Sequence, residues 1–136
     1  MMTSRSFFVD ESFQFEINQL RMQEYANASG FAVDLTTLQW KQSDSDSFVL
    51  AAQAADGTLV ATMRGEVIND PELLAKKFEC EWDFPLELKF PVLLLSRAAT
   101  LTTQRTSGLN LALRYWFLKF AEEHGIPFVV GTFVAG

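Results

Sequence analysis

The sequence predicts one domain of mixed α/β class (α+β), with both antiparallel and parallel strands in its sheet. Three observations predict it: a hairpin signal between two strand-like segments, apolar residues at helical spacing in two other segments, and two short apolar runs typical of buried strands. The predicted order within residues 1–136 is helix, hairpin, short helix, strand, long helix, strand. A chain of this length can bury roughly two-thirds of its unfolded surface.

The first predicted element is a helix over residues 12–27. Phe13, Ile17 and Leu20 follow one another at helical spacing, and Gly30 comes shortly after the predicted end. An amphipathic helix over this segment follows from the pattern.

A β-hairpin is the clearest local signal in the first half of the chain. Residues 31–40 are ambiguous, and residues 43–46 are interpreted as a polar loop. Strands are predicted over 47–55 and 58–68, because the Asp56-Gly57 pair between them suits the positive φ angles of a type I′ turn.

Two helices and two strands follow in the second half. Asp70 and Pro71 predict the N-cap and first turn of a short helix that ends near Cys80. Residues 90–101 and 126–134 are predicted to be buried strands, because each contains a continuous apolar run. Between them, a long helix that ends at Gly125 is predicted from apolar residues on one helical face, which are Leu109, Leu113, Trp116, Phe117 and Phe120.

Composition excludes several classes of protein. Seventeen acidic against 11 basic residues give a net charge of −6, which argues against general nucleic-acid binding. One cysteine cannot form an internal disulfide, and neither a secretory signal nor a membrane span is recognisable. We therefore expect a cytoplasmic protein, with no metal site because no spacing of potential ligands indicates one.

A candidate phosphate site lies where the strand over 90–101 leads through a polar turn into the long helix. The first N–H groups of a helix lack intrahelical partners and lie at the positive end of its dipole. Gly108 permits close approach of a ligand to the backbone, and Arg105 adds a positive charge. The alternative is an ordinary helix start, capped by Thr106 or Ser107.

The turn resembles the Arg/Gln-x-x-Gly-x-Gly/Ala signature of the GCN5-related N-acyltransferases (GNAT superfamily), with an Asn in place of the last small residue. The element order and the hairpin are also similar to that family, and the resemblance covers most of the chain. It implies a GNAT-like fold in which this turn binds the pyrophosphate of acyl-CoA and the preceding strand binds the pantetheine arm. The implied donor-binding residues are Ala98, Ala99, Thr100, Arg105, Thr106, Ser107, Gly108, Leu109 and Asn110.

Four further residues resemble one branch of that superfamily, the acyl-homoserine-lactone synthases and long-chain N-acyl amino acid synthases. These are Arg21, Tyr25, Arg64 and Arg97, which the resemblance assigns to substrate binding. It also implies that acyl carrier protein could supply the acyl group through its phosphopantetheine. The alternative is that Arg64 and Arg97 pair with nearby carboxylates such as Glu66.

The implied reaction is direct attack of a small-molecule amine on the donor thioester, without a covalent enzyme intermediate. Glu66 and Glu87 are the candidates for the base that takes the proton of the amine. His124 and Cys80 are not expected to take part. The alternative function is a non-catalytic acyl-CoA-binding or regulatory module.

The end of the sequence gives a further expectation. Members of the family usually continue past the fifth strand with a helix and another hairpin, whereas this sequence ends at Gly136. The fold is therefore expected to lack those C-terminal strands. Because the apolar strand 126–134 would then present an open edge, we expect a second copy to cover it in a homodimer.

Overall fold

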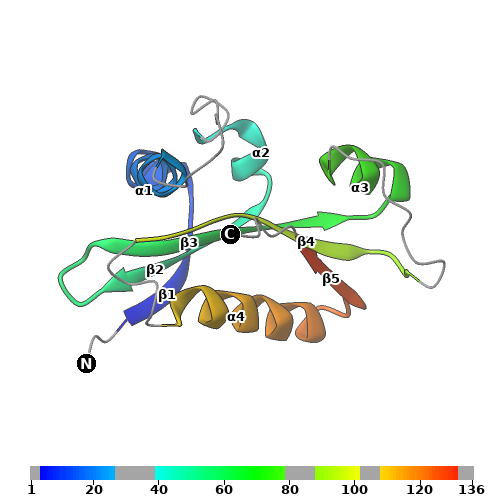
Figure 1. Cartoon of the computed structure of the whole chain (residues 1–136). Helices are drawn as coiled ribbons and strands as arrows, with labels where there is room; N and C mark the ends of the chain where they lie inside the picture. Colours follow the sequence, from blue (N-terminus) through cyan, green and yellow to red (C-terminus); the bar gives the residue numbers. More distant parts are fainter. Residues whose placement is uncertain (1–3, 27–38, 79–87, 102–107, 132–136) are drawn as a thin grey trace.

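The computed structural model describes residues 4–26, 39–78, 88–101 and 108–131. They form one five-stranded sheet with three α-helices on one face and a single long helix on the other (Figure 1). The strands, in both chain and spatial order, are β1 (Ser4–Val9), β2 (Phe48–Ala54), β3 (Leu59–Ile68), β4 (Val92–Thr100) and β5 (Phe128–Gly131). The α-helices are α1 (Gln14–Ala26), α2 (Gln42–Ser45), α3 (Pro71–Phe78) and α4 (Leu109–Glu123).

The predicted mixed α/β class is confirmed. Strands β1 to β4 pair antiparallel with their neighbours, and β4 pairs parallel with β5. The parallel pair requires a crossover, which α4 supplies on the face opposite α1, α2 and α3 (Figure 1). We call the two sides of the sheet the α4 face and the α1–α3 face.

The hairpin is confirmed, but its predicted type I′ turn is wrong. That turn needs positive φ at both central residues, and Arg97 is the one non-glycine residue with positive φ in the described part of the chain. Instead, Gly57 N donates to Ala54 O over 2.9 Å. Of the two residues predicted to be central, Asp56 and Gly57, only Gly57 has a positive φ, which is 93°. Asp56 stabilises this turn locally, because its Oδ1 accepts from Thr58 N over 2.9 Å.

The three predicted helices are confirmed close to their expected bounds. A short 3₁₀ helix (Glu11–Phe13) leads into α1, in which Ile17 and Leu20 are buried. At the start of α3, Asp70 Oδ1 accepts from Glu72 N over 3.0 Å, as expected of the N-cap. Gly125, with φ 68°, follows the end of α4. None of the described helices is long and apolar enough to span a membrane.

Two elements were not predicted. Strand β1 pairs along its whole length with β2, from Ser4 opposite Ala54 to Val9 opposite Val49. Helix α2 (Gln42–Ser45) overlaps the segment 43–46 that was predicted to be a polar loop, and Asp44 is buried in it. The polar composition of this segment hid the helix, because the helix is only four residues long and owes its place to contacts with distant residues.

The α4 face holds an apolar core with many aromatic rings. Phe117 is fully buried on α4, and it packs against β3 so closely that a Cβ on Gly65 would lie 2.6 Å from its Cε1. Leu113, Phe120 and Met63 belong to the same cluster. The absence of a side chain at Gly65 is therefore what lets the ring lie against the sheet.

Strand β5 differs from its predicted environment. The apolar run 126–134 was expected to be a buried strand, but Phe128 is 37% exposed and Val129 and Val130 are half-buried. The reason is its place at the edge of the sheet, where β4 is its one paired neighbour in the described part of the chain. Residues 132–134 of that prediction lie outside the described residues.

Candidate active site

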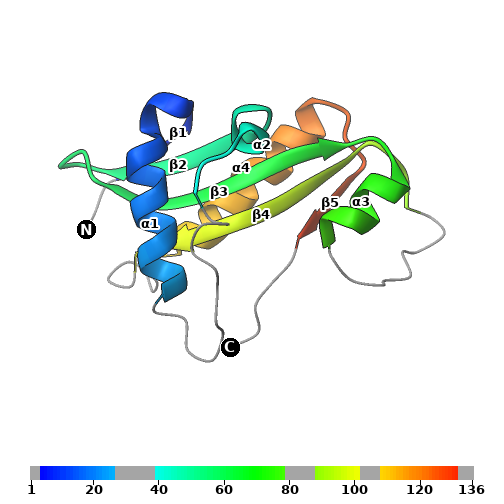
Figure 2. The same ribbon diagram turned by 90° about the horizontal axis from the view of Figure 1, so that it is seen from above.

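The two parallel strands diverge at the centre of the candidate site. Strand β5 pairs with β4 from Val92 to Leu95, and β4 then continues to Thr100. Figure 2 shows the described part of β5 turning away from the line of β4. A parallel pair that separates in this way leaves backbone N–H and C=O groups of the longer strand available to a ligand.

A β-bulge in β4 lies at the same place. Thr62 pairs with Ala99 and Arg64 pairs with Ser96, so two residues of β4 oppose the single residue Met63. One of the two, Arg97, has a φ of 53°, a conformation that L residues rarely adopt and that costs roughly 1–3 kcal/mol. Such local strain is concentrated at functional sites.

A cavity of about 210 Å³ lies between the diverging strands and α4. Its walls are mainly apolar, with one cationic residue, Arg114, and one hydroxyl, that of Ser96. A narrow apolar slot beside a strand edge fits an extended, amide-containing chain such as a pantetheine arm. The lining residues are Met63, Leu95, Ser96, Ala98, Arg114, Leu118, Val129, Val130 and Gly131.

The N-terminus of α4 lies near the end of β4. Ala98 and Leu101 pack against the apolar cluster that contains Leu109, the first residue of α4. Gly108 occupies the N-cap with a φ of 78°, makes no side-chain cap, and has open space where a Cβ would stand. Gly108 has no side chain to cap the first N–H groups, which lie at the positive end of the dipole and can bind an anion.

The structure brings together the described part of the predicted donor site. On β4, Ala98 belongs to the bulge and Ala99 and Thr100 follow it, and Gly108 and Asn110 lie at the start of α4. The side chain of Leu109 is buried in the core, so its predicted contact with a donor can come from its backbone only. Arg105, Thr106 and Ser107 lie outside the described residues.

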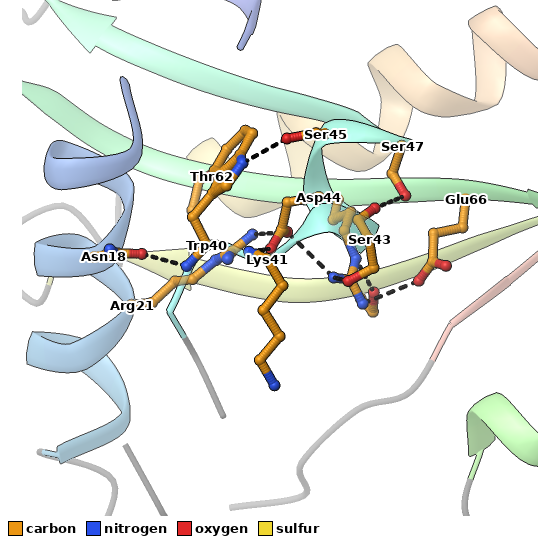
Figure 3. Close-up of polar contacts among 12 residues, drawn as sticks. Asn18, Arg21, Trp40, Lys41, Ser43, Asp44, Ser45, Ser47, Thr62 and Glu66 are labelled. Carbon is orange, nitrogen blue, oxygen red and sulfur yellow. Dashed lines mark hydrogen bonds and ion pairs between the residues drawn. The ribbon is translucent and has the colours of Figure 1, made fainter. Parts of the chain in front are cut away.

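A second polar constellation lies on the α1–α3 face (Figure 3). Arg21 of α1 is fully buried, and its Nη2 donates to Asp44 Oδ1 over 2.8 Å. Arg64 of β3 reaches the same oxygen with Nη1 over 3.1 Å. The other oxygen of Asp44 accepts from Lys41 N over 2.9 Å, which fixes the carboxylate in α2. One buried carboxylate thus joins α1, α2 and β3.

Asp44 is held in its ionised form by these partners. Burial opposes ionisation, but it is outweighed by the combined effect of the hydrogen bond and charge of Arg21, the hydrogen bond from the Lys41 N–H and the charge of Arg64. The pKa of Asp44 therefore lies below its ordinary value of 3.8.

Arg64 connects this network to the bulge and to Glu66. Its Nε donates to Ser96 Oγ over 3.3 Å, next to the bulge, and its Nη2 lies 2.9 Å from Glu66 Oε1. The other oxygen of Glu66 lies 2.9 Å from Lys77 Nζ of α3. Arg64 thus pairs with Glu66, the alternative that the sequence left open. Each oxygen of Glu66 therefore has a cationic neighbour.

The predicted acceptor-side residues separate into three groups. Arg21 and Arg64 lie together around Asp44, whereas Arg97 lies on the bulge. Tyr25 belongs to α1, but its side chain is outside the described part of the structure, as is all of Glu87. The roles of these residues in binding or catalysis stay predictions.

Sequence reasoning missed three residues of this region: Asp44, Lys77 and Ser96. Asp44 follows Lys41 at the spacing of a capping box, the one local signal for its position. Nothing local marks Lys77 or Ser96, because α3 and β4 come together only in the folded sheet. Among the described residues, no group of three His, Cys, Asp or Glu side chains is placed to bind a metal.

Known structures share this architecture, although no protein-family model and no curated protein matches the sequence. A ribosomal-protein-alanine N-acetyltransferase from Brucella melitensis biovar Abortus 2308 superposes with a TM-score of 0.65 at 16% identity, over 97% of this chain and 81% of that one. The aminoglycoside acetyltransferase AAC(6')-Iy, in complex with the bisubstrate analogue CoA-S-monomethyl-acetylneamine, gives 0.68 at 13% identity, over 97% and 80%. A GCN5-related N-acetyltransferase from Ralstonia eutropha JMP134 gives 0.68 at 18% identity, over 96% and 84%.

These similarities establish the fold. The mixed five-stranded sheet with its helices is the fold of the GCN5-related N-acetyltransferases, as the sequence resemblance implied. At these identities the similarity extends to the architecture and not to the reaction or its substrates.

Proposed function

We propose that this protein is an N-acyltransferase that moves an acyl group from a thioester donor, acyl-CoA or the phosphopantetheine of acyl carrier protein, to the amine of a small molecule. The observation that carries the proposal is the cavity between β4 and β5, which lies beside the bulge in β4. The N-terminus of α4, which begins after Gly108, lies close by, because Leu109 of α4 and Ala98 of β4 pack in the same apolar cluster. Together they supply a slot for the arm of a donor and an anion site for its phosphates.

The reaction proposed for this site is a direct transfer. The neutral nitrogen of the amine attacks the thioester carbonyl carbon, so that a C–N bond forms and the C–S bond breaks. The nitrogen loses a proton to a base, and the departing thiolate takes up a proton. Backbone N–H groups near the bulge can polarise the carbonyl, and much of the rate enhancement then comes from positioning. Glu66 and Glu87 remain the predicted bases.

A narrower proposal concerns the branch of the superfamily. Donors with long acyl chains, or delivered by acyl carrier protein, are proposed because Arg21, Tyr25, Arg64 and Arg97 resemble residues of the lactone synthases and N-acyl amino acid synthases. The resemblance in sequence is the support. The buried pairing of Arg21 and Arg64 with Asp44 favours an indirect role for these two residues, in which they hold β3 and the bulge in place.

Titration of the protein with acetyl-CoA, a long-chain acyl-CoA and acylated acyl carrier protein tests the proposal. Arg105→Ala should weaken binding of the preferred donor by about 10- to 150-fold, the loss of one charged hydrogen bond to phosphate. Arg5→Ala is the matched control, because Arg5 is exposed on β1 at the opposite edge of the sheet. Failure of every donor to bind the intact protein would overturn the proposal.

The alternative function is an acyl-CoA-binding module without catalysis. It is favoured by the ion pairs at both oxygens of Glu66, which leave this predicted base with no carboxylate oxygen free of a cation. Such a module would bind a donor but form no product with any amine. Product detected by mass spectrometry, and lost in Gly108→Val, would exclude it.

Homodimer formation through β5 is proposed as well. Its support is the position of β5 at the sheet edge and the exposure of Phe128 there. Sedimentation at micromolar concentration tests it, with a dimer expected for the wild type and a shift towards monomer for Val130→Lys. A monomeric wild type would refute it.

A further inference from the structure

A second cavity, of about 240 Å³, lies on the α1–α3 face between α2 and α3. The C-terminal end of α2, the last residues of β3 and one side of α3 line it. Glu66 and Asp46 give it negative charge, Ser43 supplies a hydroxyl, and Leu73 an apolar wall. Its volume is just below the about 300–1,000 Å³ of ordinary ligand pockets, so an occupant must be small.

Glu66 gives this cavity a fixed anionic group. Its side chain is only 8% exposed, and Oε1 lies 2.9 Å from Arg64 Nη2. Arg64 cannot follow a ligand, because Asp44 and Ser96 also hold its guanidinium. The Arg64 contact is an ion pair without the alignment of a hydrogen bond, and no hydrogen bond reaches Oε1 from the described residues. Oε1 is itself buried against Arg64, so a ligand would bind the other oxygen, Oε2, which Lys77 holds.

Lys77 is the partner of Glu66 that can be replaced. Its side chain is 32% exposed, and it reaches Glu66 Oε2 from the last turn of α3 through a flexible stem. Ion pairs with such exposure contribute little stability, and their charge is well hydrated when released. Glu66, in contrast, is fixed, and Arg64 still faces it when Lys77 leaves. The place of Lys77 on Oε2 can therefore be taken by another cation.

We propose that this cavity binds a primary ammonium group, which takes the place of Lys77 on Glu66. The exchange is one cation for one cation, so the charge balance of the buried network is unchanged while Lys77 moves into solvent. The apolar wall at Leu73 fits a methylene chain beside the ammonium group, and Asp46 adds to the attraction. The ammonium group of Lys77 thus occupies the ligand position when no ligand is bound.

The position of the site indicates the class of acceptor, an inference that rests on the proposed acyl transfer. Glu66 lies two residues along β3 from Arg64, and Arg64 pairs with Ser96, which also lines the cavity beside β5. Two residues of a strand span about 6–7 Å. An acceptor anchored on Glu66 must reach past Arg64 to the gap between β4 and β5, so its reacting nitrogen has to lie at least about this far from its ammonium group. A short aliphatic diamine has this form.

Calorimetric titration with 1,4-diaminobutane, without any donor, tests the ammonium site directly. Lys77→Met keeps the stem but removes the competing charge, so the diamine should bind it about threefold to tenfold tighter than the wild type. Lys76→Met is the matched control, a change of the same charge on a neighbouring exposed residue outside the cavity, and its affinity should equal that of the wild type. 1,4-Butanediol, the uncharged analogue, should not bind.

Glu66→Gln should abolish diamine binding, the opposite of the effect expected for Lys77→Met. Circular dichroism checks that this variant is folded. Equal diamine affinity in the Lys77→Met and Lys76→Met proteins, or no binding to either, would overturn the ammonium site. Acetyl-CoA titration of the same samples separates the two proposals. If a donor binds but the diamine does not, the ammonium site alone is refuted. If the diamine binds more tightly to Lys77→Met but no donor binds, acyl transfer alone is refuted.

Discussion

The two faces of the sheet solve the same packing problem with different chemistry. On the α4 face the fully buried side chain Phe117 fills the space above Gly65. On the α1–α3 face the side chain of Arg21 is also fully buried, and its charge is balanced by Asp44. Strand β3 serves both, because alternate residues point to opposite faces. The α1–α3 face also has two apolar clusters, one around Ile17 of α1 and one around Leu74 of α3. The comparison teaches that this face holds charges at fixed positions in addition to an apolar core, whereas the cluster on the α4 face is apolar throughout.

The two faces also differ in how they resist change. An apolar core loses contacts in proportion to what is removed, whereas a buried ionic network becomes unbalanced when one member is lost. Arg21 of α1 and Asp44 of α2 lie next to each other (Figure 3). Arg64 of β3 pairs with the same oxygen of Asp44 as Arg21 does. We therefore expect the largest single effect on the α1–α3 face, at Asp44.

Asp44→Asn should lower the free energy of unfolding by about 3–5 kcal/mol, because two buried guanidinium groups lose their common counter-charge. Urea denaturation followed by circular dichroism measures it. Asp46→Asn is the control, since Asp46 is exposed, and it should change stability by less than about 0.5 kcal/mol. If the two variants lost equal stability, the buried network around Asp44 would not be a special source of stability on the α1–α3 face.

Gly65→Ala tests the α4 face. The added Cβ would lie 2.6 Å from Phe117 Cε1, and forcing the ring away should cost about 1–3 kcal/mol. The double variant Gly65→Ala, Phe117→Leu should recover part of this loss, which a double-mutant cycle would measure as a favourable coupling. Strict additivity of the two changes would show that the close approach is not the cause.

Acid should weaken the α1–α3 face selectively. The folded state lowers the pKa of Asp44 below 3.8, so its contribution to stability is present above that pH and is lost as the pH falls through the lower, folded value. The stability difference between wild type and Asp44→Asn should therefore shrink as the pH falls below about 4. Asp10 and Asp56 also have lowered pKa values, but both proteins share them and they cancel in the difference. A difference that stays constant down to pH 2.5 would contradict the assignment.

Lys77→Met should have the smallest effect on stability, a loss below about 1 kcal/mol, because the side chain is a third exposed and Arg64 still faces Glu66. Thermal unfolding beside Lys76→Met measures it. A loss as large as that of Asp44→Asn would mean that Lys77 is a structural member of the network, which would count against its replacement by a ligand.

Local signals predicted the elements whose form depends on their own residues. Asp70 caps α3 as expected, because an N-cap acts within three residues. The spacing from Leu109 to Phe120 placed α4 and its buried face correctly, and the run over 92–95 is buried as expected. The hairpin was found for the same reason, although the turn itself takes a different form with positive φ at Gly57 alone.

Long-range packing was required for the rest. Strand β1 exists because β2 offers it an edge, and β5 is half exposed because it lies at the other edge, facts that no run of apolar residues encodes. The candidate donor site was visible in sequence because a strand, a turn and a helix start are contiguous. The ionic network was not, because Arg21 and Asp44 are 23 residues apart and meet only when α1 and α2 pack on the sheet. Residue type and spacing are sufficient for structure made by neighbours in the chain, whereas the partner of a buried charge depends on which elements the fold brings together.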